Sequence, residues 1–159
     1  MKRLDLIIAL KLLNKKSVQD IADDLGIVPE AVEKSISFLN KNGMIRHNNV
    51  MKSSLMDFII YGLPYVWPAS PEGIVKGRRA GISTDLFSFV RVPDLYVWKD
   101  PAGDEEGFGF KVLHRVLLDA KPDREFDILI NCIDVLRLQN SRAREKKIAR
   151  DEIERILRA

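Results

Sequence analysis

The chain has 159 residues, of which 46% are hydrophobic and 31% are charged, and its net charge is +3. This composition supports a packed core and excludes an intrinsically disordered chain. The longest apolar stretch, residues 4–13, is interrupted by Asp5 and Lys11, so we expect neither a membrane-spanning helix nor a signal peptide.

The single cysteine, Cys132, excludes an internal disulfide bond, and with no targeting segment we expect a cytoplasmic protein. Cys132 lies between Ile130 and Ile133 on a predicted helix, and neither histidine is near it in the sequence. These surroundings predict a buried structural thiol rather than a nucleophile.

Positive charge is concentrated at the two ends of the chain. Residues 1–60 carry nine Lys and Arg against seven Asp and Glu, a net charge of +2. Residues 61–136 carry nine against twelve, or −3, and residues 137–159 carry eight against four, or +4. This distribution favours terminal segments that approach phosphate groups and a central segment that does not.

Residues 4–13 predict a first helix that is too apolar on every side to be exposed to solvent. Ser17 is suited to cap a second helix, with Asp20 completing a capping box in its first turn. The apolar residues of this second helix recur at helical spacing, and they are Val18, Ile21, Ala22 and Leu25. Gly26 then allows the left-handed backbone that a sharp turn requires.

Pro29 is suited to the first position of a third helix, which we expect to end at Asn42 and Gly43. Its expected buried stripe consists of Val32, Ile36 and Leu39, with Phe38 as a further candidate. Two short helices joined by a glycine-containing turn predict a helix-turn-helix over residues 17–42.

A family resemblance rests on the residues of this region. They are Ser17-Val18-Gln19-Asp20-Ile21-Ala22-Asp23-Asp24-Leu25-Gly26-Ile27, Ala31-Val32, Ile36, Leu39 and Gly43-Met44-Ile45. The pattern resembles the winged helix-turn-helix transcriptional regulators, including the multiple-antibiotic-resistance-regulator type. The alternative is a three-helix bundle that does not bind nucleic acid.

The resemblance implies that the third helix enters the major groove of double-stranded DNA. The side chains expected to face DNA are Pro29, Glu30, Glu33, Lys34, Ser37 and Lys41. The sequence departs from the family here, because Val28 stands at the cap and two glutamates lie on the face. A carboxylate can accept a hydrogen bond from cytosine, but two of them weaken the attraction to phosphates.

Residues 45–47 and 50–52 can pair as the two strands of a small wing around Asn48-Asn49. Arg46, His47 and Lys52 would then face phosphate. In the alternative, Ser53 caps a helix that continues through Leu55, Phe58 and Ile59, and the wing is vestigial.

Residues 62–109 contain most of the glycine and proline, and here residues 65–67 and 95–98 predict short strands. Residues 99–104 predict a turn, and residues 107–110 predict a loop or a strand edge. Residues 71–79 predict a basic loop that either contacts an anion or is solvated.

We expect no enzyme, cofactor or metal site. The acids of the middle segment (Asp100, Asp104, Glu105 and Glu106) cluster in a turn, which is more typical of an exposed loop than of a metal site. The sequence contains no catalytic triad order, no metal-ligand spacing and no phosphate-binding fingerprint.

Residues 122–138 predict a helix, and residues 139–141 predict a break in which Ser141 caps a last helix that ends near residue 158. Basic residues surround the start of this last helix, where they oppose the helix dipole. They are Arg142, Arg144, Lys146, Lys147 and Arg150. Their partners are either nucleic-acid phosphates, with Arg142 and Arg144 in contact, or acidic side chains of the middle segment; the third alternative is a solvated face.

The wider layout also resembles a group of small prokaryotic winged-helix regulators. The residues that carry this resemblance are Gly62-Leu63-Pro64-Tyr65-Val66-Trp67-Pro68-Ala69, Trp98-Lys99-Asp100-Pro101-Ala102-Gly103 and Ser141-Arg142-Ala143-Arg144-Glu145. The resemblance spans nearly the whole chain and implies no particular ligand.

The sequence thus predicts an α+β fold that is mostly α. We expect a winged helix-turn-helix over residues 1–52, an irregular α/β segment over 53–121, and C-terminal helices over 122–159 that dimerise. The expected function is a homodimeric DNA-binding transcriptional regulator whose effector is a small molecule or a protein. The alternative is a protein-interaction module that keeps the fold without binding DNA, with Glu30 and Glu33 facing a basic partner.

Overall fold

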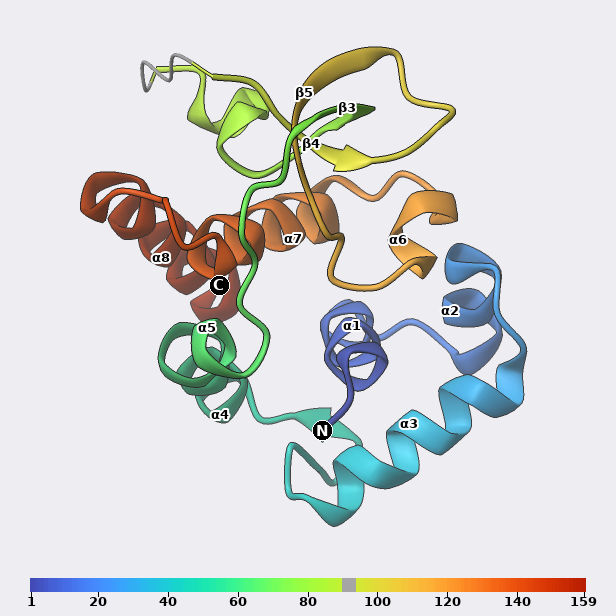
Figure 1. Ribbon diagram of the computed structural model, residues 1–159. Helices are drawn as coiled ribbons and strands as arrows, with labels where there is room; N and C mark the ends of the chain where they lie inside the picture. Colours follow the sequence, from blue (N-terminus) through green and yellow to red (C-terminus); the bar gives the residue numbers. More distant parts are fainter. Residues whose placement is uncertain (90–93) are drawn as a thin grey trace. The chain divides into compact units, whose positions relative to one another are not determined.

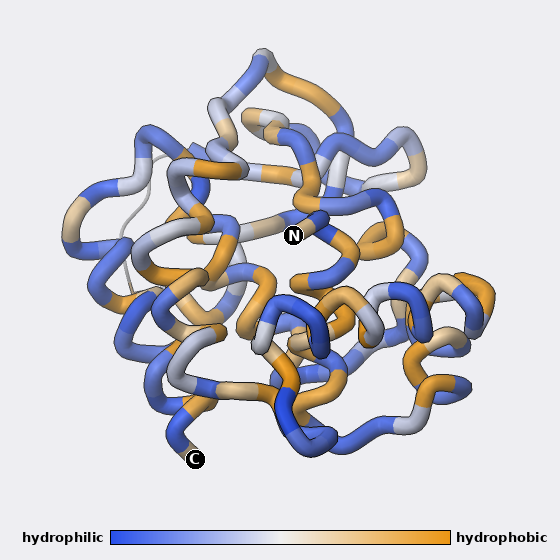
Figure 2. The backbone as a smooth tube through the Cα atoms, turned by 90° about the horizontal axis from the view of Figure 1, so that it is seen from below, coloured by the Kyte–Doolittle hydropathy of each residue, from blue (hydrophilic) through white to orange (hydrophobic). Residues whose placement is uncertain are grey.

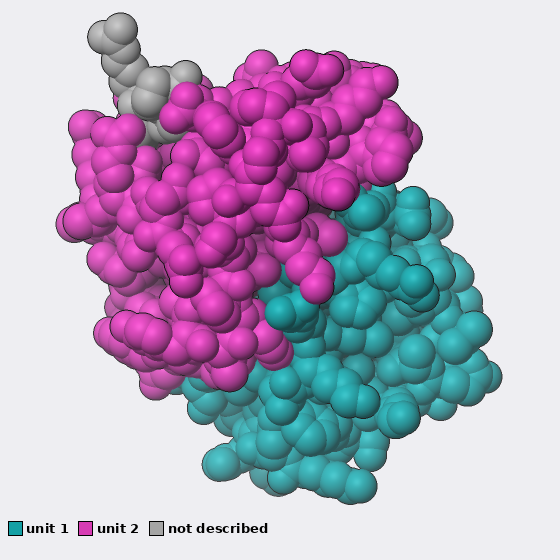
Figure 3. Space-filling view, in the orientation of Figure 1, with its two compact units in different colours: residues 1–55, 113–126 teal, residues 56–112, 127–159 magenta. Residues whose placement is uncertain are grey.

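A computed structural model describes residues 1–89 and 94–159, and its fold is α+β with more helix than strand, as expected (Figure 1). The chain forms two compact units (Figure 3). Unit 1 consists of residues 1–55 and 113–126, and unit 2 consists of residues 56–112 and 127–159. In the described ranges, no helix combines the length and the apolar character that crossing a membrane requires.

Unit 1 is built around α1 (Arg3–Leu12), which packs against α2 (Val18–Leu25) and α3 (Pro29–Lys41). Every residue of α1 from Asp5 to Lys11 is buried, which confirms that this helix is not exposed to solvent. A short helix from later in the chain, α6 (Val116–Asp119), packs against α2. The hydrophobic core of unit 1 therefore combines the N-terminal helices with residues from a distant part of the sequence.

Local signals define the ends of α2 and the start of α3 as predicted. The Ser17 hydroxyl accepts a hydrogen bond of 3.1 Å from the Asp20 N–H, and the Asp20 carboxylate accepts one of 3.4 Å from the Ser17 N–H. Gly26 adopts a φ of 65° at the C-terminus of α2, where a side chain would be strained. Pro29 occupies the first turn of α3. The capping box, the left-handed glycine and the helix-initiating proline are thus confirmed.

A short hairpin follows α3, formed by β1 (Ile45–Arg46) and β2 (Asn49–Val50) in antiparallel register. Its turn is at His47 and Asn48, which have φ of 50° and 60°, so the expected turn at Asn48-Asn49 is wrong by one residue. The Asn49 side-chain amide donates to the His47 carbonyl at 2.9 Å and supports this turn. The second strand ends early because α4 (Lys52–Asp57) begins at Lys52, so a hairpin and a helix are both present.

A cluster of four charged side chains joins three segments of unit 1. The Lys11 side chain is fully buried, and its Nζ lies 3.0 Å from Asp123 Oδ2, 3.6 Å from Asp24 Oδ2 and 4.0 Å above the ring of Phe126. Lys16 binds the same two carboxylates. The cluster holds α1, α2 and residues 123–126 together, because two cations lie between two anions.

The cluster also sets the protonation of its members. The hydrogen bond from Lys16 lowers the pKa of Asp24, and the same contact raises the pKa of Lys16. Burial alone would raise the pKa of Asp123, but hydrogen bonds from Lys11 and Lys16 lower it. Both carboxylates therefore stay ionised in the folded protein at neutral pH.

Unit 2 contains three strands that close on themselves. β3 (Ile74–Arg79) pairs antiparallel with both β4 (Tyr96–Lys99) and β5 (Glu105–Phe110), and β4 pairs parallel with β5. A Cβ at Gly77 would collide with the carbonyl oxygen of Trp98 on β4. This close approach of two backbones requires glycine.

Two expectations for the middle segment are wrong. Residues 65–67 do not form a strand, because α5 (Leu63–Val66) continues a helical run from α4 through the π-helical segment Phe58–Gly62. The wider π turn suits Pro64, which has no N–H to donate within the helix. Residues 71–79 are not a loop throughout, because β3 occupies their second half. Its pairing partners are distant in sequence, so no local signal reveals this strand.

Helices α7 (Arg124–Arg137) and α8 (Ala143–Arg158) complete the chain. Hydrophobic and hydrophilic residues alternate along the helices, as in amphipathic helices (Figure 2). The cap of α8 is not Ser141 as expected but Arg142, whose N–H donates to the Glu145 carboxylate at 2.8 Å. Ser141 therefore lies one residue before the cap of α8.

A buried ion pair organises unit 2. Asp134 Oδ1 accepts a hydrogen bond of 2.7 Å from Arg137 Nη1, and Asp134 Oδ2 accepts one of 2.7 Å from Trp98 Nε1. Arg137 Nε also donates to the Trp67 carbonyl at 2.9 Å. Burial raises the pKa of Asp134 to about 6, although Arg137 and Trp98 both act to lower it. The Asp134–Arg137 pair on α7 thus binds the segment that contains Trp98 and the segment that contains Trp67.

We expect Lys11→Met to lower the free energy of unfolding by about 3 kcal/mol, because the substitution leaves two carboxylates with one ammonium group. Urea denaturation followed by circular dichroism measures the change. The control is Lys34→Met, which removes an exposed lysine of α3 and should change stability by less than about 0.5 kcal/mol. A Lys11→Met protein as stable as the wild type would contradict the stabilising role of the cluster.

The raised pKa of Asp134 predicts a pH dependence of stability. The folded protein binds this proton more tightly than the unfolded chain, so its free energy of unfolding should fall as pH rises from about 3.8 to about 6. Asp134→Asn should remove this contribution, which amounts to up to ~3 kcal/mol for a shift of about two pK units. Urea titrations of both proteins at several pH values test this, and identical pH slopes would contradict it.

Candidate nucleic-acid interface

The exposed face of α3 is set by the residues that α3 buries. Val32, Ser35 and Leu39 are buried, so Ser35 takes the place expected for Ile36, which is only partly covered. The opposite face carries all six side chains expected to face DNA. Glu30, Glu33, Lys34, Ser37 and Lys41 are exposed, and Pro29 is partly exposed.

This face of α3 has no net charge, because Lys34 and Lys41 balance Glu30 and Glu33. Within the described part of the chain, none of these four side chains forms an ion pair. The lysines are therefore available to an external anion, and the glutamates are available to a cation or a hydrogen-bond donor.

The hairpin presents two of the predicted site residues beside the end of α3. Arg46 and His47 are exposed, and the guanidinium group of Arg46 lies over the backbone of Gly43. β1 contacts α3, so Arg46 and Lys41 belong to one region of unit 1. His47 has a positive φ in the tight turn, as a solvated turn residue can.

A basic hollow of about 540 Å³ lies between the end of α1 and the hairpin. Its polar lining residues are Lys15, Lys16, Asn48, Asn49 and Lys52, and none of the residues that line it is acidic. The sequence predicts that Lys52 faces phosphate, and it predicts for Lys15 and Lys16 only that they end the first helix. The two adjacent lysines were the sequence feature that could have indicated a basic site. Their position beside the hairpin depends on the packing of α1 against β2.

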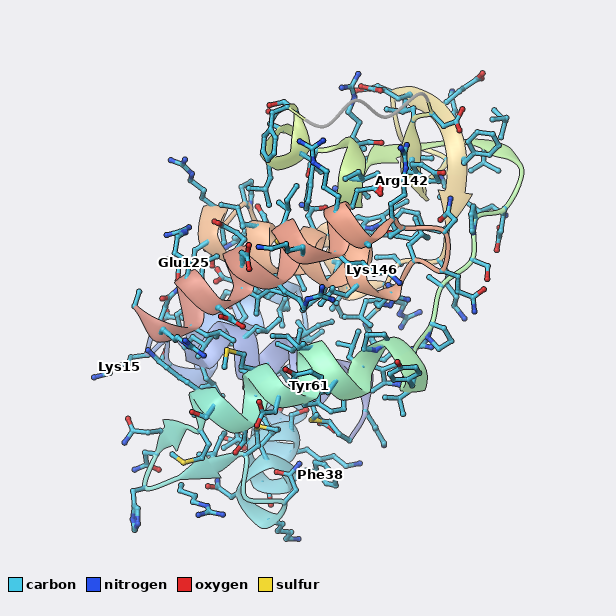
Figure 4. The ribbon with its side chains drawn as sticks, turned by 90° about the vertical axis from the view of Figure 1, so that its left-hand side faces the viewer. Lys15, Phe38, Tyr61, Glu125, Arg142 and Lys146 are labelled. Carbon is cyan, nitrogen blue, oxygen red and sulfur yellow. The ribbon has the colours of Figure 1, made fainter. Side chains whose placement is uncertain are left out.

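The basic start of α8 belongs to unit 2, and Figure 4 labels two of its basic residues, Arg142 and Lys146. Arg142 Nε lies 3.6 Å from Glu145 Oε1, so its acidic partner is on its own helix rather than in the middle segment. Arg144 is exposed. These two predicted site residues remain accessible, and α3 and the hairpin belong to the other unit.

Two arginines of the middle segment pair with acids of the same segment. Arg78 Nε lies 3.3 Å from Asp100 Oδ2, and Arg79 Nε lies 2.8 Å from Glu105 Oε2. Two of the three cations in residues 71–79, Arg78 and Arg79, are thus paired with acids of the following turn and strand. No group of three or more metal-ligating side chains gathers in the part of the chain described.

The histidine and the cysteine of the later chain are both covered, His114 partly and Cys132 fully. His114 Nδ1 accepts a hydrogen bond of 3.1 Å from the Val116 N–H, and burial lowers the pKa of His114. Cys132 is fully buried, and burial raises the pKa of its thiol to about 12. The expectation that Cys132 is a buried structural thiol is confirmed.

Comparison with models of known protein families, with curated proteins and with solved structures finds no match to this chain.

We expect Cys132 of the native protein to react with a thiol reagent at pH 8 at least about a hundred times more slowly than in the urea-unfolded protein, because the native thiol is buried and protonated. Absorbance after addition of 5,5′-dithiobis(2-nitrobenzoate) follows the reaction. Fast stoichiometric labelling of the native protein would contradict the buried position of the thiol.

Proposed function

We propose that this protein is a DNA-binding transcriptional regulator that acts through unit 1 as a winged helix-turn-helix. In this proposal α2 and α3 are the two helices of the motif, α3 is the recognition helix, and the β1–β2 hairpin is a very small wing. One observation carries the proposal: an exposed face of α3 lies between the left-handed turn at Gly26 and a hairpin that presents Arg46.

The polar side chains of this region suit a nucleic-acid contact of moderate strength. Lys41 and Arg46 supply positive charge near the C-terminal end of α3, and the basic hollow beside the hairpin adds Lys15. Cationic side chains that neutralise phosphates provide most of the sequence-independent affinity for DNA. Ser37 and the two glutamates are candidates for contacts with base edges, since a carboxylate accepts from the amino group of cytosine.

The proposal includes a homodimer, because a single small helix-turn-helix rarely provides enough affinity for an operator. Two copies would contact two half-sites one helical turn apart. The C-terminal helices are the proposed contact between the copies.

Glu30 and Glu33 favour a second candidate function. Both are exposed on α3 and have no cationic partner among the described residues. A carboxylate pair on this face suits a basic protein surface better than a phosphate backbone. The second candidate is therefore a protein-interaction module with the same fold.

We expect Lys41→Ala with Arg46→Ala to weaken binding to duplex DNA and to reduce the slope of log K against log salt by about 2, one unit for each lost phosphate contact. Genomic fragments captured by the protein and then sequenced supply the duplex, and fluorescence anisotropy at several salt concentrations supplies the slope. The control is Lys76→Ala with Lys99→Ala, which removes two exposed lysines of unit 2.

The same assay separates the two candidate functions. Under the first, Glu30→Gln with Glu33→Gln retains or raises affinity for duplex DNA of unrelated sequence, because two negative charges leave the interface, and it lowers the preference for the captured fragments, because the carboxylates that accept from cytosine are lost. Equal salt slopes for the wild type and the Lys41 and Arg46 variant, or no captured DNA at all, would overturn the proposal and favour the protein-interaction module.

A further inference from the structure

The basic hollow between the end of α1 and the hairpin has the size of a small-ligand site. Its volume of about 540 Å³ falls within the range of about 300–1,000 Å³ that is usual for such sites. Leu12, Leu13 and Val50 give it an apolar wall, and all three are partly exposed. An apolar wall beside several cations suits an organic molecule that carries an anionic group.

The charged lining of the hollow consists of lysines alone. Lys15, Lys16 and Lys52 each bring an ammonium group, and none of the lining residues is acidic. Lys15 and Lys52 are exposed, and the Lys15 side chain extends from the surface into solvent (Figure 4). Lys15 forms no ion pair with any residue that the structure describes. The hollow therefore attracts an anion, and the charge of Lys15 is available to it.

Lys16 contributes differently, because it already binds two carboxylates. Its Nζ lies 2.5 Å from Asp24 Oδ2 and 3.1 Å from Asp123 Oδ2. The buried Lys11 shares both carboxylates, so two cations and two anions cancel and this cluster adds no net charge to the hollow. An ammonium group has three N–H donors, so Lys16 keeps a third donor for a ligand oxygen.

The hairpin adds two side-chain amides. The Asn49 amide donates one hydrogen to the His47 carbonyl at 2.9 Å, which leaves its second amide hydrogen for a ligand. The Asn48 side chain forms no hydrogen bond within the described part of the chain. Both amides line the hollow, so both can donate to the oxygen atoms of an anion.

These donors suit a phosphate group better than a carboxylate. They come from three separate segments, namely the end of α1, the hairpin and the start of α4. A phosphate monoester has a charge of about −1.5 to −2 near pH 7 and three terminal oxygens that accept hydrogen bonds from different directions. No arginine lines the hollow, whereas the planar arginine fork is the group that matches a carboxylate; lysine binds phosphate as a point charge.

We propose that the basic hollow binds the phosphate group of a small phosphorylated organic molecule. Lys15 pairs with the phosphate, Lys52 and Lys16 add ammonium donors, and the hairpin amides complete the contacts. The organic part of the ligand packs on the apolar wall. The site itself does not require DNA binding. Its regulatory role rests on the proposed function: the bound phosphate occupies Lys15, which DNA would also use, so ligand and DNA weaken each other's binding.

The test is a titration of the full chain with phenyl phosphate, followed by calorimetry and by amide chemical shifts. We expect saturable binding with shifts at residues 12–16 and 48–52, which include the lining of the hollow. Inorganic phosphate should bind at least about tenfold more weakly, because it lacks the apolar part. Phenyl sulfate should also bind at least about tenfold more weakly, because it carries a single negative charge.

Two variants locate the phosphate. Lys15→Gln and Lys52→Gln should each reduce the affinity for phenyl phosphate at least about fivefold, because each removes one charge-assisted contact. Lys121→Gln is the matched control, since Lys121 is an exposed lysine of unit 1 that does not line the hollow, and it should bind phenyl phosphate normally. Absence of binding, equal binding of phenyl sulfate, or undiminished binding by Lys15→Gln would overturn the site.

A competition separates the two sources of a phosphate group. Saturating phenyl phosphate should weaken binding of the captured duplex at least about threefold, whereas phenyl sulfate at the same ionic strength should not. Simultaneous binding of both ligands without this effect would overturn the regulatory role. Shifts at the hollow with duplex DNA that lacks terminal phosphates, but not with phenyl phosphate, would assign the hollow to the DNA backbone and overturn the small-molecule site.

The failure of the site and the failure of the proposed function give different results. Phenyl phosphate binding that Lys15→Gln weakens, in a protein that captures no DNA, would leave the site standing while the proposed function fails. Intact DNA binding without phenyl phosphate binding would give the reverse.

Discussion

An ammonium group as buried as that of Lys11 is tolerated in a protein interior only where carboxylates and an aromatic face compensate for its lost hydration. Asp123, Asp24 and Phe126 provide this compensation. Asp123 lies 112 residues after Lys11, so the charge can be buried only when the later segment has returned to the N-terminal helices. The arrangement of unit 1, and with it the position of α3, depends on this cluster.

Unit 2 also buries charged side chains whose lost hydration is compensated by close partners. Asp134 and Arg137 are both buried, and their remaining hydrogen-bonding capacity is used by Trp98 and by the carbonyl of Trp67. A buried ion pair of this kind specifies which segments meet, because any other arrangement leaves a charge without a partner. Each unit therefore has an apolar core with one ionic contact that selects its partners.

The candidate interface consists of what these cores leave outside. α3 buries Val32 and Leu39, and the face that remains carries equal numbers of acids and bases. Such a face gives weak electrostatic attraction to DNA by itself, so the cations at the hairpin and beside α1 become important for the proposed function.

The local features of the fold were predictable from the sequence. The Ser17 cap, the left-handed Gly26, the start of α3 at Pro29 and the burial of Cys132 all follow from interactions within a few residues or from residue type. The exposed side chains of α3 were also predictable, because helical spacing assigns residues to faces. Long-range pairing was not predictable from the sequence. The strand β3 pairs with residues far away in the sequence, and residues 113–126 pack with an N-terminal unit that is equally distant along the chain. The position of Lys15 beside the hairpin likewise depends on how α1 packs, which only the tertiary structure decides.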